Sequence, residues 1–148
     1  MMTTAAAKSE VMIHLETRNV QDGQVNQLVQ DVPGQFFNMG KTIYLRYQEK
    51  AADGQTAVVT FKVNAAGDEV QLSRHQGDNR SRMIFAVNQQ VEAKYQTAYG
   101  NLPLTILTPK LNVSLSNYPI SGKVSVDYTL FSNGQELGQY KIRLQFTA

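Results

Sequence analysis

The sequence predicts an all-β protein, built as a single up-and-down antiparallel β-barrel of roughly 8 to 10 strands. Apolar and polar residues alternate along most of the chain, which is the period of a half-buried strand. Turn signals separate these stretches about every dozen residues, at Asp53-Gly54, Gly77-Asp78, Gly100-Asn101 and Asn133-Gly134. No stretch has the period of a long amphipathic helix, and sequential hairpins favour the up-and-down barrel.

The length and the start of the chain set the domain organisation. At 148 residues the chain fits one domain, which buries roughly 70% of its unfolded surface. Residues 1–9 are small and polar and show no periodicity. We therefore expect a flexible N-terminal tail over residues 1–9 and a single barrel domain over residues 10–148.

Composition excludes several functional classes. The chain has no cysteine, which excludes disulfides, thiolate catalysis and thiolate metal sites. It shows neither a leader-like apolar segment near its start nor a run of about 20 apolar residues, so we expect a cytoplasmic protein with no membrane partner. Its 14 basic and 12 acidic residues give a formal net charge of only +2, which argues against a DNA partner.

The alternation also locates the individual strands. Strands are expected over residues 10–18, 41–50, 56–64, 70–74, 81–87, 91–99, 102–115, 124–130 and 140–146. Pro109 interrupts one of these, and the phase of the alternation shifts after it, which predicts a bulge or bend. Residues 21–31 are rich in Gln, Asp and Asn and contain Gly23, so they are expected to form the longest loop, with a short helix over residues 23–29 as an alternative. Residues 35–39 are expected to form a brief strand or a lid over one end of the barrel.

Several motifs recur in order along the chain: IYLRYQE at residues 43–49, LSRHQG at 72–77, RMIF at 82–85, YQTAYGNLPL at 95–104, Thr108, VDYTL at 126–130 and LGQY at 137–140. Together they resemble the YwiB-like family, a bacterial domain family of unknown function. The resemblance covers nearly the whole chain beyond the N-terminal tail. It implies a calycin-like barrel of eight to ten strands, similar in outline to lipocalins and fatty-acid-binding proteins, in a soluble bacterial protein. It implies no activity.

The predicted inner face carries an unusual number of polar side chains for a core. They are Glu49, Arg74, Tyr47, Tyr95, Thr97, Tyr99, Thr108 and Tyr128. Because a buried charge is costly unless it is paired, Arg74 and Glu49 either pair with each other, meet a ligand or lie near an open mouth. One hypothesis is a small anionic or amphipathic ligand in the barrel interior, gripped by Arg74 and oriented by tyrosine hydroxyls. The alternative is an internal pair, with the hydroxyls satisfied by buried water.

The other candidate chemistries are poorly supported by the sequence. Ser73, His75 and Asp78 surround one predicted hairpin without a nucleophile elbow or an oxyanion hole, so we predict no catalytic residue and no enzyme. His14 and His75 have no suitably spaced carboxylates, and no phosphate-binding glycine motif occurs, so no metal and no cofactor are expected.

A second function hypothesis concerns the outer surface of the barrel. Arg74, His75, Arg80 and Arg82 lie close together on one predicted hairpin, and Tyr44, Arg46 and Lys62 extend this cationic patch. Such a patch could contact RNA through its phosphates. In this alternative the barrel is filled, and the protein is a non-catalytic structural or interaction module that contacts protein or RNA. No sequence feature indicates an oligomeric state.

Overall fold

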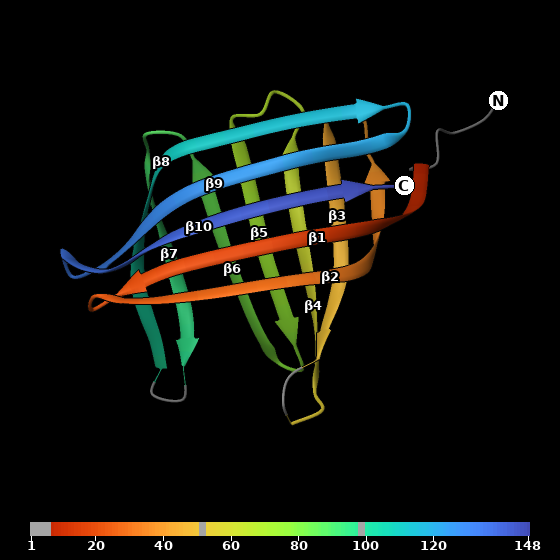
Figure 1. Cartoon of the computed structure of the whole chain (residues 1–148). Coiled ribbons are helices and arrows are strands. Elements are labelled where there is room, and N and C mark those ends of the chain that lie inside the picture. Colours follow the sequence, from red (N-terminus) through yellow and green to blue (C-terminus); the bar gives the residue numbers. More distant parts are fainter. Residues whose placement is uncertain (1–6, 51–52, 98–99) are drawn as a thin grey trace.

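The computed structural model describes residues 7–50, 53–97 and 100–148, which form ten β-strands (Figure 1). The strands are β1 (Ala7–Gln21), β2 (Gln24–Asn38), β3 (Thr42–Lys50), β4 (Thr56–Asn64), β5 (Glu69–Gln76), β6 (Asn79–Ala86), β7 (Gln90–Thr97), β8 (Gly100–Asn117), β9 (Ile120–Ser132) and β10 (Gln135–Thr147). The ladders that join neighbouring strands are antiparallel. Within the described ranges, no helix is long and apolar enough to cross a membrane.

The strands form one sheet in the order β6-β5-β4-β3-β2-β1-β10-β9-β8-β7, so the predicted up-and-down antiparallel barrel is confirmed. Pairing of β1 with β10 joins the two halves of the chain. β6 and β7 stand at the two ends of this order, and among the described residues only a parallel bridge between Val87 and Thr108 links their sides. Over the described residues, the turn between β6 and β7 does not form a β-hairpin. Instead, the Asn88 amide donates a hydrogen bond to the carbonyl of Thr108 in β8, at 2.9 Å. The barrel is therefore nearly closed, with a seam between β6 and β7.

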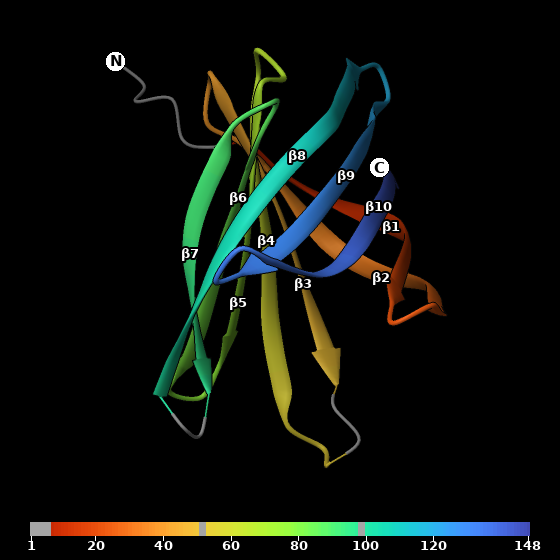
Figure 2. The ribbon, with the colours of Figure 1, turned by 90° about the vertical axis from the view of Figure 1, so that its left-hand side faces the viewer.

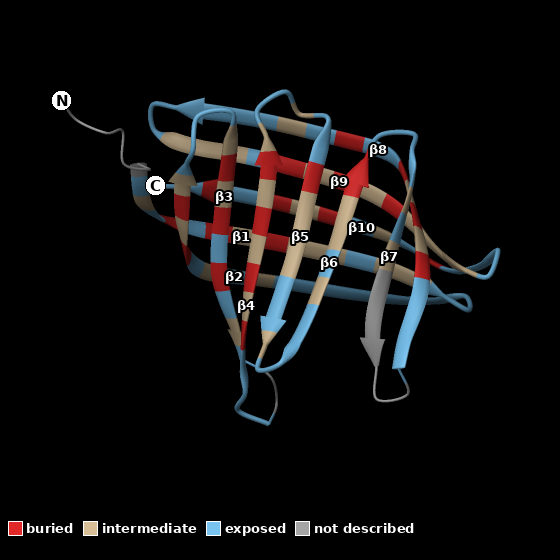
Figure 3. Ribbon diagram, turned by 180° about the vertical axis from the view of Figure 1, so that it is seen from behind, coloured by how far each residue is buried: buried red, intermediate tan, exposed pale blue. Residues whose placement is uncertain are grey.

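Two groups of strands face each other across the core. The axes of the antiparallel strands β3 to β7 are roughly aligned with one another, and β1, β2, β9 and β10 cross them at a steep angle (Figures 1 and 2). The alternation in the sequence sends one face of each strand inward, and Figure 3 shows the resulting bands of buried residues. The largest fully buried side chains are Phe61, Phe85, Phe146, Ile13, Leu45, Ile106 and Leu144.

Residues 21–31 are not the predicted loop, and no helix forms there. Asp22 and Gly23 have φ of 51° and 74°, which is typical of a type I′ turn, and β2 starts directly after them. The prediction was wrong because both faces of β2 are exposed from residue 24 to residue 29, so this part of the strand lacks the alternation of a core strand. The expected brief strand at residues 35–39 is the end of the same strand.

The boundaries of the other elements differ less from expectation. β1 begins at Ala7, so residues 7–9, which were expected in the flexible tail, pair with the end of β2. Residues 1–6 of that tail lie outside the described residues. The bulge predicted at Pro109 is confirmed, since the β8–β9 register shifts between Leu107 and Lys110. β8 pairs with β7 over residues 100–107, and with β9 over residues 105–107 and 110–117, on the two sides of the bulge.

The turn between β9 and β10 offers a test of backbone strain alone. Asn133 and Gly134 have φ of 52° and 78°, which confirms the predicted type I′ turn, and a Cβ added at Gly134 would meet nothing within 4 Å. We expect Gly134→Val to lower the free energy of unfolding by about 1–2 kcal/mol, because a β-branched residue resists positive φ. Gly134→Asn should cost clearly less. Urea denaturation measures both changes, and equal stability of the two variants would contradict this explanation.

Candidate functional site

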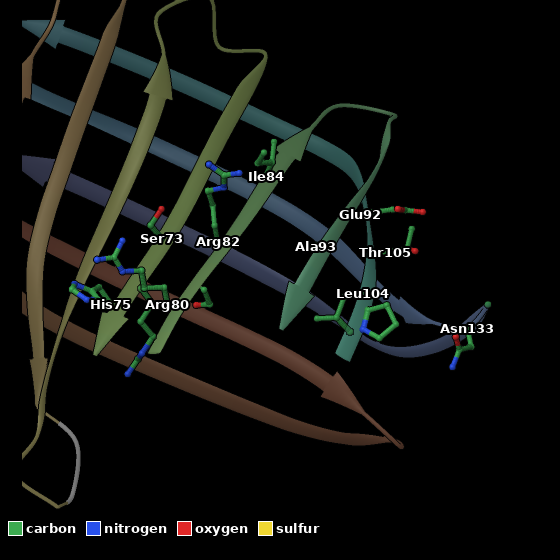
Figure 4. A pocket seen from close by; sticks show the side chains of 14 residues that line it. Ser73, His75, Arg80, Arg82, Ile84, Glu92, Ala93, Leu104, Thr105 and Asn133 are labelled. Atoms are coloured by element: carbon green, nitrogen blue, oxygen red, sulfur yellow. The ribbon is translucent and has the colours of Figure 1, made fainter. Parts of the chain in front are cut away.

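A cleft with a volume of about 1100 Å³ lies at the seam between β6 and β7. Figure 4 shows that β5 and β6 supply one side of this seam cleft and β7 and β8 the other. Its lining comprises Ser73, Arg74, His75, Arg80, Ser81, Arg82, Ile84, Glu92, Ala93, Pro103, Leu104, Thr105, Asn133 and Gly134. β6 and β7 diverge away from the segment that connects them (Figure 4), and the cleft lies between them.

The two faces of the edge strands give the cleft a rim and a floor. On the outer face, Arg82 pairs across the ladder with Ser73, Arg80 with His75, and Glu92 with Thr105. On the inner face, Arg74 pairs with Ser81 and Ala93 with Leu104. Alternation along each strand thus places polar and cationic groups at the rim, and apolar Ala93 and Leu104 at the floor.

The charges of the cleft are unbalanced. Arg80 and Arg82 are exposed, and within the described ranges neither forms an ion pair. Arg74 already has a partner, since its Nη1 lies 2.6 Å from Glu49 Oε2. Glu92 is the one carboxylate among the lining residues. The rim of the cleft therefore carries two guanidinium groups that have no carboxylate partner within the described ranges.

Arg74 and Glu49 form an ion pair, which is one of the alternatives that the sequence left open. The Arg74 side chain is 46% exposed and that of Glu49 is 22% exposed, so solvent screens the pair. The Tyr47 hydroxyl donates to Glu49 Oε1 at 3.3 Å. Burial, followed by the neighbouring carboxylate, raises the pKa of Tyr47 well above its ordinary value, so the phenol stays protonated and acts as a donor.

Tyr47, Thr108 and Tyr128, three of the other predicted ligand-binding residues, are not among the residues that line the seam cleft. Tyr47 and Tyr128 are buried in the core, where Tyr128 packs between Phe85 and Tyr140 at centroid distances of 4.6 and 5.0 Å. Burial raises the pKa of Tyr128 as well. Thr108 is fully buried, and its Oγ1 has no hydrogen-bond partner among the described residues. The side chains of Tyr95, Thr97 and Tyr99 lie outside the described part of the chain.

Sequence reasoning assigned Arg80 and Arg82 to the outer patch but not to a cavity. Both side chains do lie on the outer face of β6. They line the seam cleft because β6 is an edge strand that does not pair with β7 in the described part of the chain. The R-S-R pattern at residues 80–82 on an edge strand is the signal that could have identified them. In the rest of the proposed outer patch, the Arg46 guanidinium lies over the Phe37 ring at 5.4 Å.

The candidate histidines lie apart from each other. His75 is at the rim of the cleft together with Ser73, whereas Asp78 is not among the lining residues. His14 contacts Asp31 at 2.7 Å and Glu16 at 3.2 Å, and these carboxylates raise its pKa. Across the described residues, no three His, Asp or Glu side chains gather in a way that could hold a metal ion.

Comparison with known proteins places this fold in a family. The model of the family described as a domain of unknown function (DUF1934) matches residues 13–144. The chain belongs to this family. The crystal structure of the ywiB protein from Bacillus subtilis is similar to this DUF1934 chain, with a TM-score of 0.81 at 19% sequence identity, over 97% of this chain and 95% of that one. No curated protein matches the chain in sequence.

These matches confirm the resemblance to the YwiB-like family that the ordered motifs indicated. At 19% identity the likeness shows the fold alone, and that fold agrees with the ten-stranded, nearly closed barrel. The DUF1934 chain is thus a β-barrel domain of unknown function.

Proposed function

We propose that this barrel is a non-enzymatic binding protein that takes a small anionic or amphipathic ligand in the seam cleft, in the bacterial cytoplasm. The observation that carries the proposal is the pair of free guanidinium groups, Arg80 and Arg82, at the rim of a cavity of about 1100 Å³. This volume suits a drug-sized molecule, since ligand cavities commonly measure about 300–1,000 Å³.

The lining determines which chemistry fits. A carboxylate, sulfonate or phosphate would accept hydrogen bonds from Arg80 and Arg82, and guanidinium groups bind such groups in a bidentate manner. An apolar part of the ligand would cover Ala93 and Leu104 on the floor. The ligand would therefore bind in the open seam and not in the deep interior of the barrel, where phenylalanines fill the core.

A direct test uses 1-anilinonaphthalene-8-sulfonate, a fluorescent probe that carries an anionic sulfonate on an apolar ring system. We expect the protein to bind it, with enhanced fluorescence. The Arg80→Gln/Arg82→Gln double variant should bind at least about tenfold more weakly, because each charged hydrogen bond contributes about 1.5–3 kcal/mol. Fluorescence titration at two salt concentrations measures the effect.

Arg46→Gln is the matched control for the single variants Arg80→Gln and Arg82→Gln, because each of the three removes one positive charge and Arg46 is an exposed residue on β3, outside the cleft lining. It should leave the affinity for the probe almost unchanged. Equal weakening by Arg46→Gln would indicate that net charge alone attracts the probe, and an unchanged affinity of the double variant would exclude the rim arginines. Either result contradicts the proposed site.

A further inference from the structure

The ribbon formed by β1 and β2 carries a long unpaired strand edge. β2 pairs with β1 along its whole length, from residue 24 to residue 38. On its other side it pairs with β3 over residues 34–38 only. No strand in the described ranges pairs with residues 24–33 on that side. Figure 2 shows that the tip of the ribbon stands away from β5 to β7, so the edge is open to another chain.

Hairpin geometry identifies the backbone groups that are free at this edge. In a two-residue type I′ hairpin, the residues next to the turn form a hydrogen-bonded pair, here Gln21 with Gln24. Since hydrogen-bonded pairs alternate along an antiparallel ladder, even-numbered residues of β2 bond to β1. Val25, Gln27, Val29 and Asp31 therefore direct their N–H and C=O groups outward.

Residues 24–30 of this edge lack the features that normally keep strand edges apart, and Asp31 and Pro33 follow only at its inner end. Charged side chains, prolines and bulges protect most edges, especially lysines. Residues 24–30, with the sequence QVNQLVQ, contain no charge and no proline. Their ladder with β1 has no register shift. Val25, Leu28 and Val29 are 52%, 54% and 51% exposed, so apolar surface accompanies the free backbone groups.

We propose that the edge of β2 pairs with the same edge of a second copy of this chain, which forms an antiparallel dimer about a two-fold axis at Gln27. With this register, Val25 lies opposite Val29 of the second copy, and each Gln27 lies opposite its equivalent. The strand edge is self-complementary, because its free N–H and C=O groups all belong to odd-numbered residues. A two-fold axis normal to the sheet at Gln27 places odd-numbered residues of one copy opposite odd-numbered residues of the other.

A second copy fits this edge better than a foreign peptide. With the two-fold axis at Gln27, residues 24–30 pair with the same residues of the second copy, and Asp31 and Pro33 lie outside the paired segment. The paired segment carries no charge, so it offers no charge pattern with which to select a different partner, and like-on-like pairing involves no repulsion. The interface involves one strand per copy, and interfaces below about 1,200 Å² are commonly weak. We therefore expect a dimer that dissociates on dilution. The dimer does not depend on the ligand proposal, because residues 24–33 do not line the seam cleft.

Because the chain has no cysteine, a single introduced thiol reports the pairing directly. In a hydrogen-bonded antiparallel pair, opposite Cα atoms are about 5.5 Å apart, within the range that a disulfide spans. Gln27→Cys should therefore form a disulfide-linked dimer under mild oxidation. Met39→Cys is the control, because Met39 is 56% exposed but lies beyond the edge. The Met39→Cys variant should form at least about tenfold less cross-linked dimer than Gln27→Cys, since a tenfold difference corresponds to about 1.4 kcal/mol of pairing free energy.

Sedimentation velocity over a roughly hundredfold range of protein concentration provides the second measurement. The unmodified chain should shift from monomer to dimer. Gln27→Pro removes an outward N–H but no bond to β1, so it should fold and should raise the dissociation constant at least about tenfold. A chain that stays monomeric throughout, a dimer that Gln27→Pro leaves unchanged, or equal cross-linking of both cysteine variants would overturn the proposal.

Discussion

Phe85→Ala should lower the free energy of unfolding by about 3–5 kcal/mol, the usual cost of truncating a buried phenylalanine. Phe85 is fully buried, and its ring packs on Tyr128, which stacks in turn on Tyr140. This aromatic series connects the edge strand β6 with β9 and β10 across the core. Because β6 has no ladder with β7, we expect the truncation to loosen β6 in particular.

Chemical denaturation measures the change in stability, and hydrogen exchange of the β6 amides locates it. Ile84→Ala provides the control, because Ile84 is the next residue on the same strand and is only partly buried. It should cost clearly less and should leave exchange in β6 nearly unchanged. Uniformly faster exchange over all strands of the Phe85→Ala variant would contradict a local role at the seam.

Gly122→Val should lower the free energy of unfolding by about 3 kcal/mol, at the upper end of the usual cost of overpacking. A Cβ at Gly122 would lie 2.7 Å from the Phe146 ring and 2.8 Å from the Ser114 carbonyl oxygen. The Phe146 ring lies over Gly122 at a paired position of β9 and β10. A side chain here therefore displaces both a core ring and a neighbouring backbone.

Thermal and urea unfolding of Gly122→Val and of the exposed neighbour Lys123→Ala check this prediction. Lys123→Ala should change the stability by less than about 0.5 kcal/mol. Phe146→Leu, combined with Gly122→Ala, should cost less than the sum of the two single changes, because the smaller side chain yields space to the new Cβ. Strict additivity would show that the ring and Gly122 do not interact.

The sequence predicted the barrel because its strands are half-buried. Val59, Phe61 and Val63 alternate with polar residues, and each of them is buried in the structure. The type I′ turn at Asn133-Gly134 was predictable because few residues tolerate positive φ. The first half of β2 was missed for the opposite reason, because a strand with two exposed faces has no apolar period.

The candidate site was less predictable, because the seam cleft depends on the absence of a hydrogen-bonded ladder between β6 and β7 within the described residues. The strands expected at residues 81–87 and 91–99 imply a hairpin turn at residues 88–90, yet the Asn88 amide donates a hydrogen bond to the Thr108 carbonyl of β8. That contact spans distant parts of the chain, and no local pattern encodes it. Arg74 was correctly placed beside Glu49, but its exposure at the mouth of the barrel follows from where the crossing strands end.

Pairing of the first and last strands has a consequence for the order of folding. Met12 pairs with Thr147, so the barrel can join its two halves only after the C-terminal strand has been made. Contacts between such distant residues form late and slow the folding rate, because a large loop must close first. During synthesis, β1 lacks its β10 neighbour and exposes that edge. Incomplete chains of this protein thus expose an unpaired edge of β1, the kind of surface that makes folding intermediates prone to aggregation.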